Sequence, residues 1–206
     1  YRLTDSWGNP SAGQSLSVSV NTGEKIMVRS NSDGNVTVSY GPKNNAGLYL
    51  ITAQAVDYPA VIATQTLQFV GGMPANMILT ASPQSMPSLD VKSDAVSSVM
   101  AKVIDLSGNP VQGQTVFFSI EAVDTGTFNQ TIEPAIESGA TRTSVIGAEL
   151  SAVSDVNGFA KVNFYPGAFT DDYRAPGYSD MAQGTANVRA RWSTVTRDID
   201  LSYKNY

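Results

Sequence analysis

The stretch Asp105-Leu106-Ser107-Gly108-Asn109-Pro110-Val111-Gln112-Gly113-Gln114 has a second copy in this chain, Asp5-Ser6-Trp7-Gly8-Asn9-Pro10-Ser11-Ala12-Gly13-Gln14. Both copies follow the pattern Asp-x-x-Gly-Asn-Pro-x-x-Gly-Gln with the same internal spacing. Glycine and asparagine tolerate positive φ, proline fixes φ and removes a backbone donor, and the leading aspartate can accept a hydrogen bond from an N–H two residues on. The pattern therefore predicts a turn, and its recurrence predicts a repeated fold unit.

Runs rich in apolar residues lie on both sides of the second copy, at residues 99–104 and 115–120. After the first copy, residues 15–20 alternate between polar and apolar side chains, as in a half-buried strand. A turn between two such runs is typical of a strand-turn-strand unit. We therefore expect strands on both sides of each copy.

Composition excludes several classes of site. The chain has 206 residues, enough for one or two domains, and a net charge of −5, which disfavours nucleic acid as a partner. Neither cysteine nor histidine occurs, so disulfides, thiolate and histidine metal sites and Ser-His-Asp catalysis are excluded. No apolar run approaches the ~18–20 residues of a membrane span. No signal peptide is recognisable, as expected of a mature or trimmed product.

A second motif also recurs, although less faithfully. Ser32-Asp33-Gly34-Asn35 is matched with Ser154-Asp155-Val156-Asn157-Gly158, and Tyr40-Gly41-Pro42 with Tyr165-Pro166-Gly167. The offset between matched residues grows from 100 at the first motif to 122 and then 125. This growth predicts an insertion of about 22 residues within 124–143 and a further insertion within 168–183. Both are expected to be surface loops, where added length costs little. We also expect one helical turn near Pro134 in the first insertion.

Short strands bounded by turns, without helical periodicity, indicate an all-β fold of two tandem immunoglobulin-like β-sandwiches. We place the first module at residues 1–72 and the second at 73–206, with Gly71-Gly72 as a short hinge. The second module has 32 residues before its turn aspartate and the first has 4, so the first lacks the opening strand expected at residues 77–81 of the second. Either the chain is a piece of a longer protein, or another chain donates that strand by β-augmentation.

The order of these motifs carries a resemblance. Asp-x-x-Gly-Asn-Pro-x-x-Gly, a β-rich run, Ser-Asp-x-Asn-Gly-x-Ala and a closing hairpin together resemble the bacterial immunoglobulin-like repeats of invasin and intimin-type surface proteins. The match covers residues 73–205 nearly completely and residues 1–70 more loosely. The resemblance implies extracellular modules that act as stalks or spacers, sometimes adhesive, without catalytic residues.

The best candidate for recognition is a loop in the second module's further insertion. Tyrosine and arginine are favoured anchors of protein interfaces, and the loop combines both with aspartates. The alternative is a loop that packs on its own sheet. The spacing of the aspartates fits no EF-hand, so neither a metal nor a cofactor is predicted. The candidate residues are Asp171, Asp172, Tyr173, Arg174, Tyr178 and Asp180.

Other candidate residues give weaker evidence of a functional site. Asn35 and Asn129 begin glycosylation sequons, whose use the sequence leaves open. Arg189 and Arg191 beside Trp192 indicate a solvated outer strand face with a core tryptophan rather than a binding stripe. The spacing of four glutamates in or beside the 124–143 insertion does not predict convergence on one cleft, so we expect no enzyme. They are Glu121, Glu133, Glu137 and Glu149.

The sequence thus predicts a non-enzymatic, extracellular structural or adhesive module of a cell-surface protein. One alternative is a subunit of a surface filament or pilus-like assembly, completed by strand donation from a partner chain. Another is an accessory module of a secreted carbohydrate-active enzyme. The expected partners are another protein or a surface glycan, together with neighbouring modules or a strand-donating chain at the N-terminal edge.

Overall fold

The structure is a computed structural model that describes all residues except 124–126, 129, 135–145, 173, 175–177 and 206. The described residues form fifteen strands and no helix. They divide into two compact units, Tyr1–Val70 and Gly71–Tyr206. No helix in these described parts is long and apolar enough to cross a membrane.

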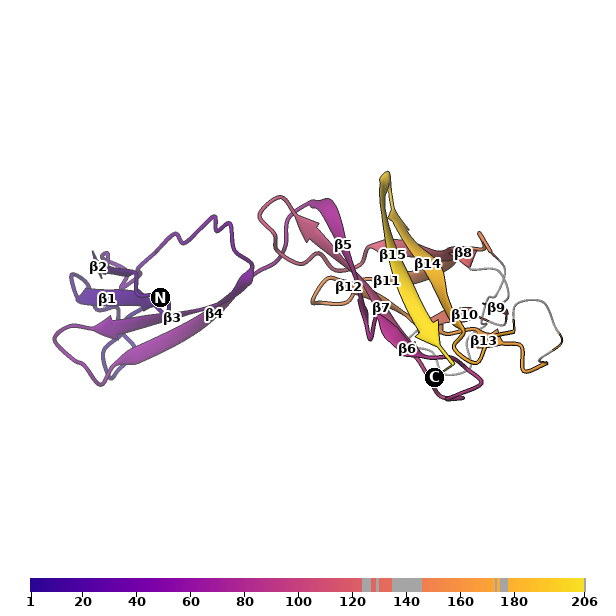
Figure 1. Cartoon of the computed structure of the whole chain (residues 1–206). Coiled ribbons are helices and arrows are strands. Elements are labelled where there is room, and N and C mark those ends of the chain that lie inside the picture. The colour runs from indigo at the N-terminus through magenta and orange to yellow at the C-terminus, as the bar shows by residue number, and fades with distance from the viewer. Residues whose placement is uncertain (124–126, 129, 135–145, 173, 175–177, 206) are drawn as a thin grey trace. The chain divides into compact units, whose positions relative to one another are not determined.

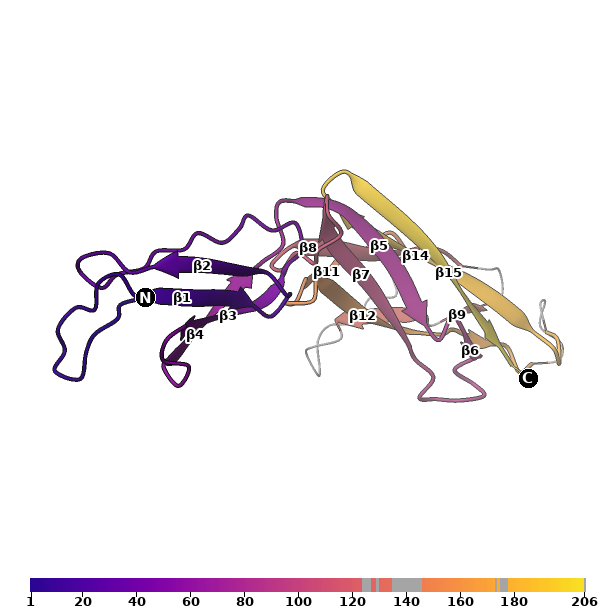
Figure 2. The same ribbon diagram turned by 90° about the vertical axis from the view of Figure 1, so that its left-hand side faces the viewer.

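The second unit is built from two facing sheets (Figures 1 and 2). The first sheet has the order β10–β12–β7–β5, and the second has the order β11–β8–β14–β15–β6. A separate pair joins β13 and β9. The strands are β5 (Pro74–Ser82), β6 (Ser85–Pro87), β7 (Ser97–Asp105), β8 (Thr115–Val123), β9 (Thr127–Phe128), β10 (Thr131–Pro134), β11 (Leu150–Val153), β12 (Phe159–Tyr165), β13 (Ala168–Phe169), β14 (Gln183–Trp192) and β15 (Val195–Lys204).

Alternation of side chains forms the core between these sheets. Every second residue of β7 is buried, including Val99 and Val103, and β8 buries Val116 and Phe118 opposite them. Successive side chains of a strand point to opposite faces, so this pattern places one apolar face of each sheet inward. Burying each large apolar side chain contributes ~1.5–3 kcal/mol, which makes this core the main stabilising feature of the unit.

The first unit has one sheet of four strands, in the order β2–β1–β3–β4. This order reproduces β11–β8–β14–β15 of the second unit. Val18 of β1 pairs with Ala53 of β3, as Phe118 of β8 pairs with Ala190 of β14. The strands are β1 (Ser15–Val20), β2 (Lys25–Arg29), β3 (Gly47–Ala55) and β4 (Ile62–Phe69).

The second layer of the first unit is reduced to two extended segments, one near Tyr1 and Leu3 and one at residues 35–40. They meet at a bridge between Arg2 and Asn35, and their side chains pack on the small core of Leu16, Val18, Val36, Ile51 and Ala53. Within residues 1–70, all of which are described, no strand lies where β5 lies in the second unit. The predicted all-β immunoglobulin-like fold, with the opening strand absent from the first module, is confirmed.

The second repeated motif is real, but its predicted alignment is wrong. Ser30, not Ser32, is equivalent to Ser154. The Ser30 hydroxyl donates to the Ser11 carbonyl at 2.7 Å and accepts the Gln14 N–H at 2.9 Å. The Ser154 hydroxyl makes the same two bonds, to Val111 and from Gln114, each at 2.8 Å.

The turn after each serine confirms this alignment. Oδ1 of Asn31 accepts the N–H groups of Asp33 and Asn35, as Oδ1 of Asp155 accepts those of Asn157 and Phe159. Asparagine and aspartate both have an acceptor oxygen at this position, so the two hydrogen bonds are retained although the residue type differs. The offset is therefore 124, and it matches Tyr40 with Phe164 rather than with Tyr165 as predicted.

Glycine is required at one position of this turn in both units. A Cβ on Gly34 would lie 2.3 Å from the Leu3 carbonyl oxygen, and one on Gly158 would lie 2.7 Å from that of Val103. Both glycines have positive φ, 73° and 80°. The two motifs therefore pack against each other in each unit, and the approach of the backbones allows no side chain.

The strand pairings give the lengths of the two insertions in the second unit. Arg29 pairs with Ser15 as Val153 pairs with Thr115, so the offset rises from 100 to 124 and 24 residues are added between β8 and β11. Ala53 corresponds to Ala190, an offset of 137, so 13 more residues are added before the middle of β14. Most of the predicted range 124–143 lies outside the described residues.

One local prediction is wrong. Pro134 ends strand β10 rather than lying in a helical turn. Residues 36–40 form no ladder, because their counterparts in β12 pair with Ser97 and Val99 of β7, for which residues 1–70 contain no equivalent.

The two linker glycines are held rather than free. The Gly72 N–H donates to Oδ2 of Asp105 at 2.8 Å. A Cβ on Gly71 would lie 2.2 Å from the Pro110 carbonyl oxygen. Both glycines thus lie close to the turn of the second unit, and the hinge between the two modules stays a prediction.

Candidate functional site

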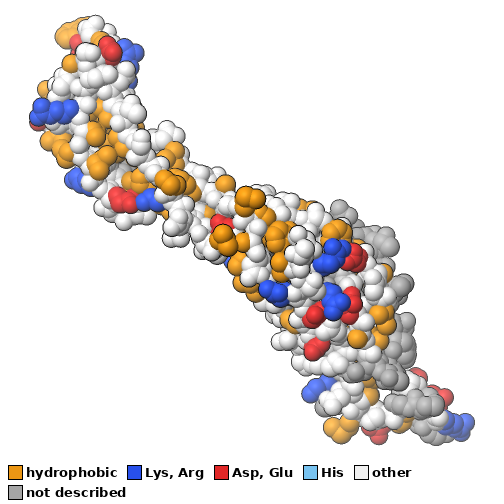
Figure 3. Space-filling view, turned by 90° about the horizontal axis from the view of Figure 1, so that it is seen from above, with side chains coloured by type: hydrophobic (Ala, Val, Ile, Leu, Met, Phe, Trp, Pro, Cys, Tyr) orange, Lys and Arg blue, Asp and Glu red, His pale blue; other side chains and the backbone are white. Residues whose placement is uncertain are grey.

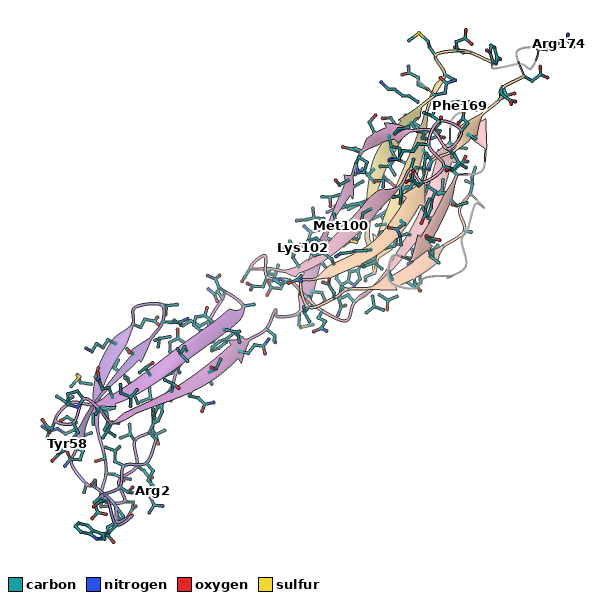
Figure 4. All side chains as sticks on the ribbon, turned by 90° about the horizontal axis from the view of Figure 1, so that it is seen from below. Arg2, Tyr58, Met100, Lys102, Phe169 and Arg174 are labelled. Atoms are coloured by element: carbon teal, nitrogen blue, oxygen red, sulfur yellow. The ribbon has the colours of Figure 1, made fainter. Side chains whose placement is uncertain are left out.

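The predicted recognition loop joins β13 to β14 at one end of the second unit. Figure 4 labels Phe169 at its start and Arg174 at its tip. The Phe169 ring is buried and packs on Tyr203 with centroids 5.7 Å apart. At the other end, Asn205 Nδ2 donates to the Ser179 carbonyl at 3.0 Å. Both ends of the loop are therefore attached to the body of the unit.

Within the loop, the structure brings the predicted residues together in two pairs. The Arg174 N–H donates to Oδ1 of Asp172 at 2.9 Å, and the Tyr178 hydroxyl donates to Oδ1 of Asp180. The hydrogen bond to Asp180 raises the pKa of Tyr178. Asp171 is exposed, and Tyr173 lies outside the described residues. The loop thus presents a local turn with charged and phenolic groups facing solvent, and its recognition role stays a prediction.

Two carboxylates of this loop have local hydrogen-bond partners. Asp172 accepts a backbone N–H and Asp180 accepts a phenol, so each has a local partner. In the parts of the chain that the structure describes, no group of three or more acidic side chains converges.

The outer face of the large sheet carries paired charges. Arg189 contacts Asp198 at 2.7 Å and Glu121 at 2.9 Å, and the hydrogen bond to Asp198 raises the pKa of Arg189. A β-bulge between β8 and β14 accompanies the Glu121 contact. Arg189 is therefore held by two carboxylates and is not an open cation for a ligand.

Arg191 is held in the same way on the neighbouring part of this face. Its guanidinium makes two bonds to Glu149, at 2.8 and 2.7 Å, and lies 4.7 Å from the centre of the Phe117 ring. This pairing lowers the pKa of Glu149 and raises that of Arg191. Trp192 packs partly buried against the core, and its Nε1 donates to Oε1 of Gln114 at 3.3 Å.

The three described glutamates among those singled out from the sequence have different partners. Glu121 and Glu149 bind different arginines, and Glu133 accepts the hydroxyl of Tyr165. Glu137 lies outside the described residues. Of the two sequon asparagines, Asn35 is exposed, and Asn129 is not among the described residues.

The sequence predicted an unpaired edge in the first unit but not the groove beside it. This open groove has a volume of about 560 Å³ and lies between residues 1–5 and the start of β4. Its apolar floor includes Leu3, Leu16 and Ala53. The count of residues before each turn aspartate was the signal for the edge, but the walls of the groove come from strands that only tertiary structure brings together.

Comparison with known proteins places the chain among surface proteins. No family model matches it. Over 170 residues, 78% of this chain, it is 29% identical to the inverse autotransporter adhesin YeeJ of Escherichia coli (strain K12). The chain is related to the bacterial immunoglobulin-like domains of surface proteins. This relationship indicates that the immunoglobulin-like chain is a cell-surface or extracellular protein.

The matched part is a small share of that adhesin: the immunoglobulin-like chain spans 7% of its length. Solved structures match the chain at low similarity. Invasin, a bacterial integrin-binding protein, has a TM-score of 0.35 and 18% identity over 98% of this chain and 34% of its own. A glycosyl hydrolase family 2 member from Bacteroides cellulosilyticus has a TM-score of 0.43 and 15% identity over 94% and 22%. Such likenesses carry no argument about activity.

Proposed function

We propose that these two immunoglobulin-like modules are a non-enzymatic structural and adhesive part of a longer cell-surface protein. The observation that carries the proposal is the repeated framework in which each turn is fixed by an internal side chain. Ser30 and Asp5 hold the turns of the first unit, and Ser154 and Asp105 those of the second. The similarity to an adhesin supports it.

The framework suits a part that must hold its shape outside the cell without disulfides. The chain contains no cysteine, so its turns depend on hydrogen bonds and its sheets on apolar packing. On the outer face of the large sheet, Arg189 and Arg191 are each paired with a carboxylate of a neighbouring strand or loop. These features support a role in extending and presenting other parts of a surface protein.

Adhesion is assigned to the loop between β13 and β14. This loop is part of the addition that distinguishes the second unit from the first, and it exposes Asp171, Asp172, Arg174 and Tyr178 at one end of the unit. Loops on a rigid scaffold are the usual place for recognition. The partner class that such groups suit is a protein surface or a glycan, since phenol, guanidinium and carboxylate bind both through hydrogen bonds.

An adhesion assay tests this assignment. Beads coated with the full chain are added to epithelial cells and compared with beads that carry Asp171→Ala, Asp172→Ala, Arg174→Ala and Tyr178→Ala together. A matched control carries Lys92→Ala and Asp94→Ala, an exposed pair elsewhere in the unit. We expect adhesion to fall to that of uncoated beads only for the loop variant. Equal adhesion by all three coatings would contradict a role of the loop.

The filament alternative has one observation in its favour, the open groove of the first unit. A strand from another chain would enter there by β-augmentation. The accessory-module alternative has no comparable support, because the glycoside hydrolase likeness is one of fold alone.

A further inference from the structure

A second groove of the first unit lies between strands β1 and β2 and the segment at residues 38–43. This β1–β2 groove has a volume of about 340 Å³ and shares no lining residue with the open groove beside β4. Its floor is apolar and includes Val18, Ile26 and Ile51. Ile26 pairs with the buried Val18 and so faces the core side of the sheet, yet it is 47% exposed. Figure 3 shows hydrophobic side chains at the surface of the first unit.

In the second unit, strand β10 occupies the equivalent place. β10 pairs with residues 162–165 of β12, and the offset of 124 makes these the counterparts of residues 38–41, which line the groove. β10 also contacts β8 and β11, the counterparts of β1 and β2. Ile132 of β10 is fully buried in the core, and Leu150, the counterpart of Ile26, packs against that core. An aliphatic side chain at the position of Ile132 therefore covers this place in the second unit.

The turn between β1 and β2 keeps the first unit from filling this groove itself. The Val20 N–H donates to the Glu24 carbonyl at 2.8 Å, and the Gly23 N–H donates to the Val20 carbonyl at 2.9 Å. These bonds close the connection within residues 20–24, whereas β9 and β10 both lie in the corresponding connection between β8 and β11. The groove is therefore open because two strands of the first unit are joined by a short turn.

The backbone of Ser39 faces the β1–β2 groove. The Val36 N–H donates to the Tyr1 carbonyl at 2.8 Å, and the Val36 carbonyl accepts from the Tyr1 nitrogen at 2.9 Å. Backbone groups of an extended segment alternate between its two sides, so those of Ser39, three residues on, point the other way. Asn163, the counterpart of Ser39, pairs with Glu133 of β10. Ser39 thus presents one donor and one acceptor to an added strand.

Lysine side chains make the lining of this groove positive. Lys25 and Lys43 line it together with Glu24. The Lys43 Nζ lies 2.6 Å from Oε1 of Glu24 and 4.5 Å from the centre of the Tyr40 ring, so the charges of Lys43 and Glu24 offset each other. Lys25 then gives the groove a net positive charge on a chain whose own net charge is −5. Electrostatic complementarity therefore favours an acidic group in whatever binds there.

We propose that the β1–β2 groove binds an extended segment of a partner protein, antiparallel to the segment that carries Ser39, with an aliphatic side chain at the position of Ile132 and an acidic residue beside it. The exposed Ile26 calls for the aliphatic side chain, and Lys25 favours the acid. In β10, Ile132 followed by Glu133 shows that a strand of this chemistry fits. The proposal goes beyond adhesion through the β13–β14 loop and does not depend on it.

Peptide display against the full chain tests the proposal. A random library of linear peptides on phage is selected for binding, and the dissociation constants of the enriched peptides are measured for the chain and three variants. Ile26→Glu places a charge in the apolar floor, and Ser39→Pro removes the N–H that faces the groove. Leu48→Glu is the matched control, since Leu48 is 65% exposed and does not line the groove. Circular dichroism verifies that each variant is folded, and Ser39→Pro keeps the test decisive if Ile26→Glu is not.

We expect the enriched peptides to combine an aliphatic residue with a neighbouring aspartate or glutamate. Ile26→Glu and Ser39→Pro should each weaken binding about tenfold or more, and Leu48→Glu should leave it unchanged. Hydrogen exchange at the Ser39 amide should slow when the peptide is bound. Failure to enrich such peptides, or equal binding by the chain and all variants, would overturn the proposal, and unchanged exchange at Ser39 would overturn the added strand.

Discussion

Oδ2 of Asp105 accepts the backbone N–H of Gly72 at 2.8 Å and so ties the start of the second unit to its repeated turn. The same carboxylate accepts the side-chain amide of Asn109 at 3.0 Å. The bond from Asn109 and then that from Gly72 lower the pKa of Asp105 to about 2. Asp5 has the Asn9 contact without a bond equivalent to that from Gly72, and its pKa is lowered as well.

Asp105→Asn is expected to lower the unfolding temperature of the second unit at pH 7. The pKa of Asp105 is depressed in the folded state, so its contribution is fully present above its ordinary pKa near 3.8. The contribution is lost as pH falls through about 2. Thermal unfolding followed from pH 7 to pH 2 should therefore show the two proteins converging below pH 4. A difference that stays constant down to pH 2 would contradict the assignment.

Gly71→Ala and Gly72→Ala form a matched pair. A Cβ on Gly71 would lie 2.2 Å from a backbone oxygen, whereas one on Gly72 would meet only the Asp105 carboxylate at 3.4 Å, an ordinary contact. We expect Gly71→Ala to lower the free energy of unfolding by about 1–3 kcal/mol and Gly72→Ala by less than about 0.5 kcal/mol. Denaturant unfolding measures both, and equal effects would show that the linker is not held against Pro110.

Ser154→Ala removes one hydroxyl that serves two backbone groups. The N–H of Gln114 would lose its acceptor and the carbonyl of Val111 its donor, in a place where Ser154 is 2% exposed. A loss of about 1–3 kcal/mol in the free energy of unfolding is expected. The exposed Ser151→Ala on β11 is the control and should change it by less than about 0.5 kcal/mol. A small effect of Ser154→Ala would mean that the turn is held by its backbone alone.

Phe117 and Phe118 test the orientation of β8. Phe118 is fully buried in the core, while Phe117 faces outward under the guanidinium of Arg191. We expect Phe118→Ala to lower the free energy of unfolding by about 3–5 kcal/mol, and Phe117→Ala to have a clearly smaller effect. The reverse order, measured by urea unfolding, would mean that the strand is shifted by one residue.

The sequence predicts the strands and turns of this fold well because their signals are local. The alternation around Val116 and Phe118 places the buried face, and the Asp105 turn carries its own glycine, asparagine and proline. The match of Ser30 with Ser154 escapes sequence comparison because the residue after each serine differs, Asn31 in the first unit and Asp155 in the second, and only the hydrogen bonds of these two residues are repeated. Pairings between distant strands, such as β6 with β15, leave no local pattern.

For the candidate loop too, the sequence predicts the local features but not the contacts. Its residue types are readable from the sequence, but the contacts of Asp172 and Asp180 depend on how the chain turns between Phe169 and Asn205. The open groove is the converse case, because the short segment before Asp5 predicts the absent strand, while Tyr58 and Ile62 reach the groove only through the β3–β4 hairpin.

Surface display is the central functional claim, and antibody labelling of whole cells tests it most directly. An antibody raised against residues 1–206 is applied to intact and to permeabilised cells of the organism that encodes the chain. We predict that intact cells label as strongly as permeabilised ones. Labelling that requires permeabilisation would contradict the account.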